Sequence, residues 1–319
     1  MTRRGWLLFA AMCVIWGIPY LLIRVAVRDV DPATLVFLRT GIGGLLLLPL
    51  ALRVGGFRAV ARRWRPLLAF SVIEVAGPWV MLGDAERHLS SSLSGLLVAA
   101  VPLLGLVVAR LTGTGDGDAG VVRMIGLLVG LAGVVTLLGL DVGSIHGPAL
   151  AEMGVVVLGY SIAPTIMARW LADLPSLPVV CTALLLVAVG YLPYAAWHLP
   201  TSLHAKPAWS VVVLAAVCTA LAFLVFFSLV AEVGASRATV FTYVNPAVAL
   251  VLGVLLLDEP FTAGIAVGFP LILVGSVLAT RRGTGQSMRT SPAGVANTAA
   301  ITPVSPPGGS HSTSTPSSG

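Results

Sequence analysis

Long apolar stretches without charge alternate with short polar segments along most of this chain. The clearest pair covers residues 238–257 and 263–280, which hold no charged residue and are separated by Asp258-Glu259-Pro260. A helix of about 20 residues rises about 30 Å, which matches the hydrocarbon core of a bilayer. Each stretch therefore predicts one membrane crossing, and the turn residues between them predict a tight helical hairpin.

The same pattern predicts an all-α membrane protein with ten transmembrane helices. The expected spans cover residues 5–23, 33–52, 67–83, 89–109, 124–140, 148–168, 177–197, 208–230, 238–257 and 263–280. Beyond Arg282 the composition changes to Gly, Ser, Thr and Pro, which bury too little apolar surface to offset chain entropy. Residues 283–319 are therefore predicted to form a disordered tail.

Arginine is distributed unevenly between the segments that connect these spans. The connection from Arg53 to Pro66 holds five arginines, the densest basic cluster in the chain. Positively charged loops are retained on the cytoplasmic side, and an even number of spans then places both termini in the cytoplasm. The polar run Asp84-Ala85-Glu86-Arg87-His88 is expected at the outer surface.

Composition narrows the class of protein. Hydrophobic residues make up 57% of the chain and charged residues 10%, against about 25% charged in soluble domains, so a soluble domain is excluded. The net charge of +6 is explained by arginine in cytoplasmic loops rather than by binding of nucleic acid. Cys13, Cys181 and Cys218 lie in apolar stretches without metal-ligand spacing, so no metal or cofactor is expected. Arginine outnumbers lysine eighteen to one, which favours a bacterial source and hence the bacterial inner membrane.

The two halves of the chain correspond to each other. A shift of 144 residues, with a two-residue adjustment for the last two pairs, aligns Trp16 with Tyr160, Pro102 with Pro246, Gly126 with Gly268 and Gly133 with Gly275. Residues 1–140 and 141–282 are therefore expected to form two repeats of five spans. Since five is odd, the second repeat enters the membrane from the opposite side, as in many secondary transporters that work by alternating access.

Several motifs resemble the EamA-type family of the drug/metabolite transporter superfamily, over about residues 5 to 282. Its opening pattern is similar to Trp16-Gly17 followed by Arg39. Its closing pattern is similar in order and spacing to Gly234-Ala235-Ser236, Tyr243-Val244-Asn245-Pro246, Leu257-Asp258-Glu259-Pro260, Gly268 and Gly275. The resemblance implies ten helices in two inverted repeats, a central cavity, and export or exchange of small metabolites. Thr114-Gly115-Asp116 departs from the Gly-Glu usual in the first repeat.

Glu74, near the middle of the third span, is the sharpest candidate for a functional residue. An ionised carboxylate at mid-membrane costs on the order of 3 kcal/mol, so this side chain should face a cavity or stay protonated. It is a candidate proton or substrate site, and the alternative is a neutral acid that joins two helices. Glu152, near the outer end of the sixth span, is a candidate coupling residue or a solvated residue at the cavity mouth.

Arg39 lies roughly 10 Å inside the second span. It is expected to reach the outer surface with its long side chain, to form a structural ion pair with a residue such as Glu152, or to bind a substrate carboxylate. Aromatic side chains with polar atoms near the middle of their spans either line a cavity or pack between helices; these are Trp16, Tyr20, Trp79, Tyr160 and Tyr243.

Pro102 and Pro246 occupy matching places and are predicted to be hinges, because proline removes a backbone donor from its helix. Asn245 is a further candidate for substrate binding. Asn245-Pro246-Ala247 forms one NPA box, but a water channel needs two, and the matching segment is Ala100-Val101-Pro102-Leu103. The serines at 90–94 have no histidine within any span as a base, so they are expected to cap or pack a helix.

Together these observations predict a secondary transporter that exports a small amino acid-like or drug-like metabolite, with the lipid bilayer and protons as its other partners. An importer or exchanger of the same fold is the first alternative. An intramembrane enzyme or scaffold is the second, although no catalytic constellation is present in the pattern.

Overall fold

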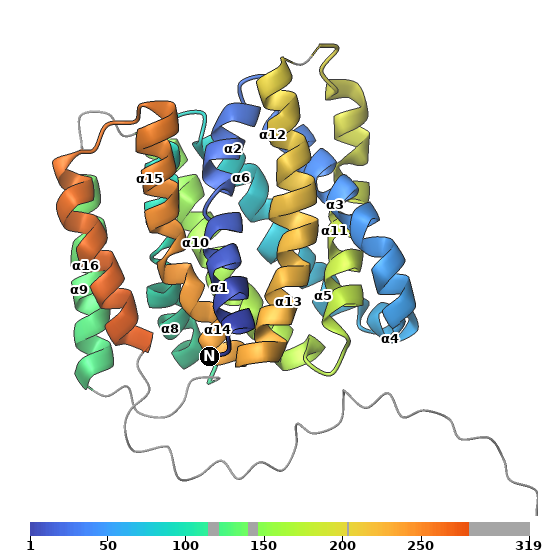
Figure 1. Cartoon of the computed structure of the whole chain (residues 1–319), viewed down its shortest axis with the longest axis horizontal. Coiled ribbons are helices and arrows are strands. Elements are labelled where there is room, and N and C mark those ends of the chain that lie inside the picture. Colours follow the sequence, from blue (N-terminus) through green and yellow to red (C-terminus); the bar gives the residue numbers. More distant parts are fainter. Residues whose placement is uncertain (114–120, 140–145, 203, 281–319) are drawn as a thin grey trace, which may run out of the picture. The chain divides into compact units, whose positions relative to one another are not determined.

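A computed structural model of the chain describes residues 1–113, 121–139, 146–202 and 204–280. The predicted tail at 283–319 lies outside the described residues, as does Thr114-Gly115-Asp116. Within the described ranges every regular element is helical, and the helices run side by side as a bundle (Figure 1).

The helices of the first half are α1 (Arg3–Ile15), α2 (Pro19–Ala26), α3 (Pro32–Val54), α4 (Phe57–Arg62), α5 (Trp64–Phe70), η1 (Ser71–Ala76), α6 (Gly77–Ala85), α7 (Ser91–Val98), α8 (Val101–Leu111) and α9 (Val121–Gly139). Those of the second half are α10 (Gly147–Ile166), η3 (Met167–Leu171), α11 (Ser176–His198), α12 (Ala205–Ala215), η4 (Ala216–Leu221), α13 (Ala222–Val233), α14 (Ala235–Ala238), η5 (Thr239–Tyr243), α15 (Asn245–Leu257) and α16 (Ala263–Thr280). The segment from Arg53 to Pro66, predicted to be a loop, instead contains α4 and the start of α5.

The protein is a multi-pass membrane protein by the length and composition of these helices. Nine continuous or joined helices in the described residues are long and apolar enough to cross a bilayer, and a shorter apolar helix follows at Ala263–Ala279. Large apolar side chains such as Leu128 and Leu255 are exposed on the bundle. In a membrane protein these side chains face lipid, which is as apolar as they are.

Both matching prolines stand at a helix start. Pro102 is the second residue of α8, directly after the break from α7, and Pro246 is the second residue of α15, directly after the 3-10 segment η5. Proline fits the first turn of a helix, where its missing N–H has no partner to lose, but it interrupts a continuous helix. The two spans are therefore divided where the sequence predicted flexible points.

The described residues contain three π-helical segments, η1, η3 and η4, which the sequence did not predict, and two of them, η1 and η4, begin 145 residues apart at Ser71 and Ala216. Each lies inside a longer helix, η1 between α5 and α6 and η4 between α12 and α13. Such wide turns are rare and often occur at functional sites. Here η1 carries Glu74 and η4 carries Thr219.

Helices α9 and α16 pack with their backbones in contact. A methyl group added at Gly133 would lie 2.6 Å from the backbone nitrogen of Ile272 and 2.8 Å from the carbonyl oxygen of Gly268. Small residues permit this close approach, which is a common source of helix association in membranes. The aligned glycines therefore pack the last helix of each half against the other.

Gly133→Ala is expected to destabilise the protein by about 1–3 kcal/mol, because the added methyl group meets backbone atoms that cannot move aside. The loss should appear as a lower midpoint in heating followed by size-exclusion chromatography in detergent. Gly139→Ala, in the same helix, is the matched control, since a methyl group there meets nothing within 4 Å. Equal midpoints for the two variants would contradict the tight contact.

Candidate functional site

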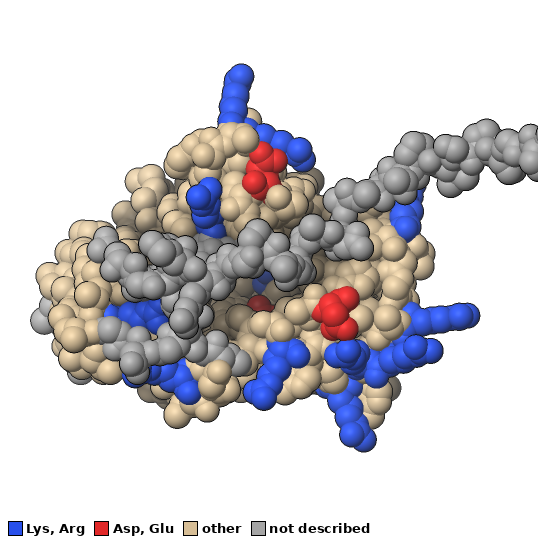
Figure 2. Space-filling view, turned by 90° about the horizontal axis from the view of Figure 1, so that it is seen from below, with Lys and Arg blue, Asp and Glu red and all other residues tan. Residues whose placement is uncertain are grey.

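One face of the bundle is hollowed near its centre. We call the face at which α1 begins the N-terminal face, and the face at which α2 ends the opposite face. Figure 2 shows the N-terminal face with a hollow in which basic and acidic atoms are visible at depth. Polar groups inside the bundle therefore lie beneath an opening on this side.

Arg39 of α3 is held in the interior by two contacts. Its Nε donates a hydrogen bond to Thr219 Oγ1 at 3.0 Å, and its guanidinium carbon lies 3.6 Å from the centre of the Trp79 ring. A guanidinium over an indole face is a favourable cation–π contact, stronger where water is excluded. Arg39 is 7% exposed and forms no ion pair with any described residue. The expectations that it reaches the surface or pairs with Glu152 are both wrong.

Thr219, which sequence reasoning missed, depends on the wide turn η4. Its hydroxyl donates to the carbonyl of Leu214 at 2.9 Å, five residues earlier, while it accepts from Arg39. Thr219 also stands 145 residues after Glu74, the same offset as the two π-helices. This offset, close to the 144-residue shift between the two halves, is the one feature of the sequence that could have identified Thr219 as a site residue.

Glu74 is half-buried in η1, and its carboxyl group makes no hydrogen bond or ion pair with the described residues. It is near enough to Tyr160 of α10 to interact with it electrostatically, as are Arg39 and Glu86. Tyr160 also lies within hydrogen-bonding range of the Trp79 indole. We call Arg39, Glu74, Trp79, Tyr160 and Thr219 the interior polar cluster.

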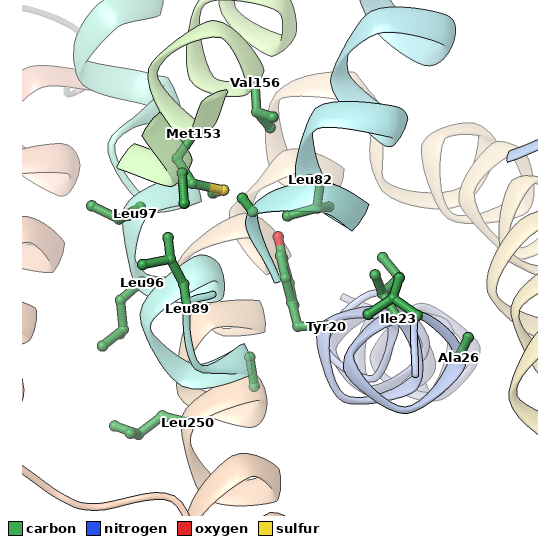
Figure 3. Close-up of a cluster of buried hydrophobic side chains, with 14 of the residues drawn as sticks. Tyr20, Ile23, Ala26, Leu82, Leu89, Leu96, Leu97, Met153, Val156 and Leu250 are labelled. Atoms are coloured by element: carbon green, nitrogen blue, oxygen red, sulfur yellow. The ribbon is translucent and has the colours of Figure 1, made fainter. Parts of the chain in front are cut away.

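Tyr20 of α2 lies at the border of this cluster. It interacts electrostatically with Tyr160, Glu86 and Arg39. Its ring is packed among apolar side chains, and its hydroxyl points toward the part of the buried core that holds Leu82 and Val156 (Figure 3). Tyr20 therefore joins the polar cluster to the core beneath the opposite face.

The interior polar cluster offers a permanent cation, a titratable acid and two aromatic rings. Only Nε of Arg39 is hydrogen-bonded within the described structure, so the terminal nitrogens of the guanidinium keep donors for a planar anion such as a carboxylate. The Glu74 carboxyl group can bind a proton or accept from an amine. Among the described residues no group of three histidine, cysteine or acidic side chains is placed to hold a metal ion.

Three predicted site residues hold helices together instead. Trp16 packs on an aromatic cluster, 5.1 Å between ring centres from Phe241, and the Tyr243 hydroxyl donates to the carbonyl of Ser276 at 3.3 Å. In the orientation that satisfies its amide, Asn245 donates to the carbonyls of Cys13 and Phe241, each at 3.1 Å. These contacts join the first, ninth and tenth predicted spans and leave the three side chains outside the cluster.

Glu152 lies apart from the interior polar cluster. Its carboxyl group interacts with Asp84 and His146, near the end of α6 and the start of α10. Its Oε2 is buried without a hydrogen-bond partner in the described residues, and both predicted roles, coupling and a place at the cavity mouth, stay predictions.

At the opposite face a contact joins the two halves of the chain. Glu259, in the link from α15 to α16, accepts from the backbone N–H groups of Ser91 and Ser92 at 2.7 and 2.9 Å and from the Ser92 hydroxyl at 2.5 Å. The first N–H groups of a helix lack internal partners and carry partial positive charge, so a carboxylate there is stabilising. Ser90 caps the same helix by accepting from Leu93 N at 3.1 Å, as the serine run predicted.

The chain reversal that carries Glu259 explains the Asp258-Glu259-Pro260 motif. Asp258 takes a left-handed φ of 52°, and the backbone N–H groups of Asp258 and Glu259 both donate to the Gly253 carbonyl. Aspartate tolerates this conformation better than most residues, and it ends helices in this way. The motif therefore ends α15 and directs Glu259 at α7.

Glu86 contradicts its predicted place in an exposed outer turn. The residue is 0% exposed, and neither carboxylate oxygen has a hydrogen-bond partner in the described structure. Its backbone carbonyl accepts from the Arg24 guanidinium. Because burial removes the carboxylate from water, the pKa of Glu86 is raised well above its ordinary value.

A helical multi-pass protein with a fixed cation, an acid and aromatic rings gathered in its interior has the features of a membrane transporter. The comparison with protein families identifies the group within that class. The chain belongs to the EamA-like transporter family, whose family model matches residues 3–139 and again residues 152–281.

Two curated relatives are similar over most of their length. An "Uncharacterized transporter" of Archaeoglobus fulgidus (strain ATCC 49558 / DSM 4304 / JCM 9628 / NBRC 100126 / VC-16) is 24% identical over 88% of this chain and 99% of its own. "Uncharacterized transporter YvbV" of Bacillus subtilis (strain 168) is 26% identical over 88% of this chain and 92% of its own. A solved structure described as "Crystal structure of protein" has the same fold, with a TM-score of 0.63 at 22% identity, and covers 88% of this chain and 98% of its own.

Proposed function

We propose that this protein is a secondary transporter that moves a small metabolite across the bacterial inner membrane by alternating access, in the direction of export. The observation that carries the proposal is the interior polar cluster. It gathers a fixed cation, Arg39, and a titratable acid, Glu74, inside the bundle, and Figure 2 shows basic and acidic atoms at depth in a hollow on the N-terminal face. At the opposite face Glu259 joins the two halves by accepting from Ser91.

We further propose that the fold is two inverted repeats of five spans, residues 1–140 and 141–282. Three observations support this arrangement. The family model matches twice in succession. The π-helical segments η1 and η4 and the prolines at helix starts recur at offsets of 145 and 144 residues. Finally, α9 and α16 pack glycine against glycine, as related elements of two repeats can do.

The proposed orientation gives the N-terminal face to the cytoplasm, with both termini on that side. The arginine distribution supports it, because the segment from Arg53 to Pro66 lies between α3 and α5 on this face. The hollow then opens to the cytoplasm, where a metabolite for export would bind. The opposite face, closed here, opens outward in the second state of the cycle.

The chemistry of the interior polar cluster favours a small molecule that carries an acidic group beside an apolar part. The guanidinium of Arg39 suits the acidic group, and the rings of Trp79 and Tyr160 suit the apolar part. An amino acid-like or drug-like compound has this character. The carboxyl group of Glu74 would then bind a proton or an amine of the substrate.

Flux across the membrane of proteoliposomes tests the proposal. Purified protein reconstituted in vesicles, loaded with a mixture of labelled metabolites, should release one or a few of them with saturable kinetics, while protein-free vesicles and Arg39→Met vesicles should not. An enzyme or scaffold gives no saturable flux and contradicts the proposal. Flux that saturates only in the uptake direction would support the importer instead.

Pro102→Ala and Pro246→Ala are each expected to slow transport about fivefold, because alanine supplies an N–H that favours a continuous helix across the break by about 1 kcal/mol and so stiffens the point of flexing. Membrane insertion should be unaffected. Pro193→Ala, inside the continuous helix α11, is the matched control and should transport at the parental rate. Parental rates in both hinge variants would leave helix packing as the role of the two prolines.

A further inference from the structure

Glu86 is a buried acid that the interior polar cluster does not use. It caps the end of α6 at the opposite face, in the interval between α6 and α7. Its side chain is fully enclosed, and both carboxylate oxygens are without a hydrogen-bond partner in the described residues. An ionised carboxylate in such a place costs several kcal/mol, so the group must be neutral, or the face must open.

The charged and titratable groups around Glu86 come from four other parts of the fold. Arg24 and Tyr20 face it from α2, Arg39 from α3, Tyr160 from α10, and Glu259 from the link between α15 and α16. None of them forms an ion pair or hydrogen bond with its carboxyl group in the described structure.

The nearest of these groups are already engaged elsewhere. Arg24 donates to the backbone carbonyl of Glu86, Arg39 is held by Trp79 and Thr219, and Glu259 caps α7. The negative charge of Glu259 opposes a second negative charge nearby. Arg24, Arg39 and Glu259 thus have contacts of their own in this structure, and a proton is what neutralises the Glu86 carboxyl group.

We propose that Glu86 is a proton-binding site and that its protonation allows the opposite face to close. The inference rests on the proposed alternating access and adds a second acid to it. In the open state the carboxyl group is hydrated and takes up a proton from the solution on that side. In the closed state the neutral acid is enclosed, as it is in this structure.

The direction of the pH dependence follows from linkage. The pKa of Glu86 is raised in the closed state and ordinary in a hydrated open state. The stabilisation of the closed state is therefore complete below the ordinary pKa and is lost as the pH rises through the raised pKa. Between the ordinary and the raised pKa each further pH unit should favour opening by up to about tenfold, and above the raised pKa the equilibrium should no longer change with pH.

Hydrogen exchange measured by mass spectrometry tests this proposal without any substrate. The full chain in lipid nanodiscs is labelled at several values between about pH 6 and about pH 9. The reporting peptides cover the amides of residues 20–27, which finish at the opposite face, and of residues 90–97, which start there. Wild type and Glu86→Gln are compared at the same pH, so the intrinsic chemical exchange rate cancels.

We expect exchange of these amides to rise with pH in wild type relative to Glu86→Gln, by up to about tenfold per pH unit. Glu232→Gln, at an acid on the N-terminal face that accepts from Thr2, should behave as wild type. Glu86→Leu is the second neutral variant if Glu86→Gln does not fold, and it should lose the pH dependence in the same way.

Three outcomes would overturn the proposal. The first is the same pH dependence in Glu86→Gln and wild type, and the second is no pH dependence in wild type. The third is closure by sodium chloride, but not by choline chloride, at constant pH, which would make the site one for a metal cation. Loss of metabolite flux with an intact pH dependence of exchange would instead count against the proposed transport function and leave the proton site standing.

Discussion

Glu74→Gln vesicles are expected to lose the acceleration of flux that an imposed pH gradient gives to the parental protein, while still binding the substrate. Glutamine keeps the shape and the hydrogen-bonding capacity of the side chain but fixes it in a neutral state. In a low-dielectric site the charged form is disfavoured, so the affinity of Glu74 for a proton should differ between a cavity open to the acidic side and one open to the neutral side. Flux with and without the gradient measures the effect.

Glu232→Gln is the control for this experiment, because that acid lies at the N-terminal face, where it contacts Thr2 and Arg4, rather than inside the bundle. It should respond to the gradient as the parental protein does. An unchanged gradient response in Glu74→Gln would reduce Glu74 to a structural residue and remove it from the coupling mechanism.

Arg39→Met is expected to abolish transport, and Arg39→Lys to raise the substrate KM by about tenfold or more. Lysine keeps the charge but loses the flat stack on Trp79 and the Nε donor to Thr219. A desolvated cation–π contact is worth about 2 kcal/mol, and about 1.4 kcal/mol corresponds to a factor of ten. Initial rates over a range of substrate concentrations separate the two effects.

Thr219→Val separates positioning by Arg39 from binding by Arg39. The variant removes the acceptor for Nε but leaves the guanidinium in place, so the substrate KM should rise less than in Arg39→Lys. Transport at the parental rate in Arg39→Met would show that the guanidinium serves packing alone.

The helices were predictable because a bilayer imposes one simple rule on the chain. Twenty uncharged and mostly apolar residues in a row, as in residues 238–257, have few alternatives to a membrane-spanning helix. The breaks before Pro102 and Pro246 were predictable for a similar reason, since proline acts on its own backbone. The apolar spans and the proline breaks depend on residues that are adjacent in the chain, so both can be read from the sequence.

The candidate site was only partly predictable, because it depends on how distant helices meet. Arg39 and Glu74 were recognised as charges in apolar stretches, but the contacts of Arg39 with Trp79 and Thr219 join α3, α6 and η4. The π-helical turn that presents Thr219 leaves no mark in hydrophobic periodicity.

Glu86 was also not predictable from the sequence, because its burial depends on helices that are distant in the chain. It stands in the polar run from Asp84 to His88, which reads as an exposed turn. The fold instead encloses it beneath α2 and the link that carries Glu259. Polar neighbours in the sequence therefore did not mean that Glu86 is exposed to solvent in the fold.

The central claim is that one interior site opens to the two faces in turn, and distances between spin labels test it most directly. One pair of labels belongs on exposed residues of the N-terminal face, Arg58 and Arg237, and the other on exposed residues of the opposite face, Arg28 and Phe261. The three native cysteines are buried and are replaced before labelling. In nanodiscs at about pH 6 and about pH 8, we expect two distances for each pair, with the first pair closing whenever the second opens. A single distance for both pairs under every condition, with active protein, would contradict alternating access.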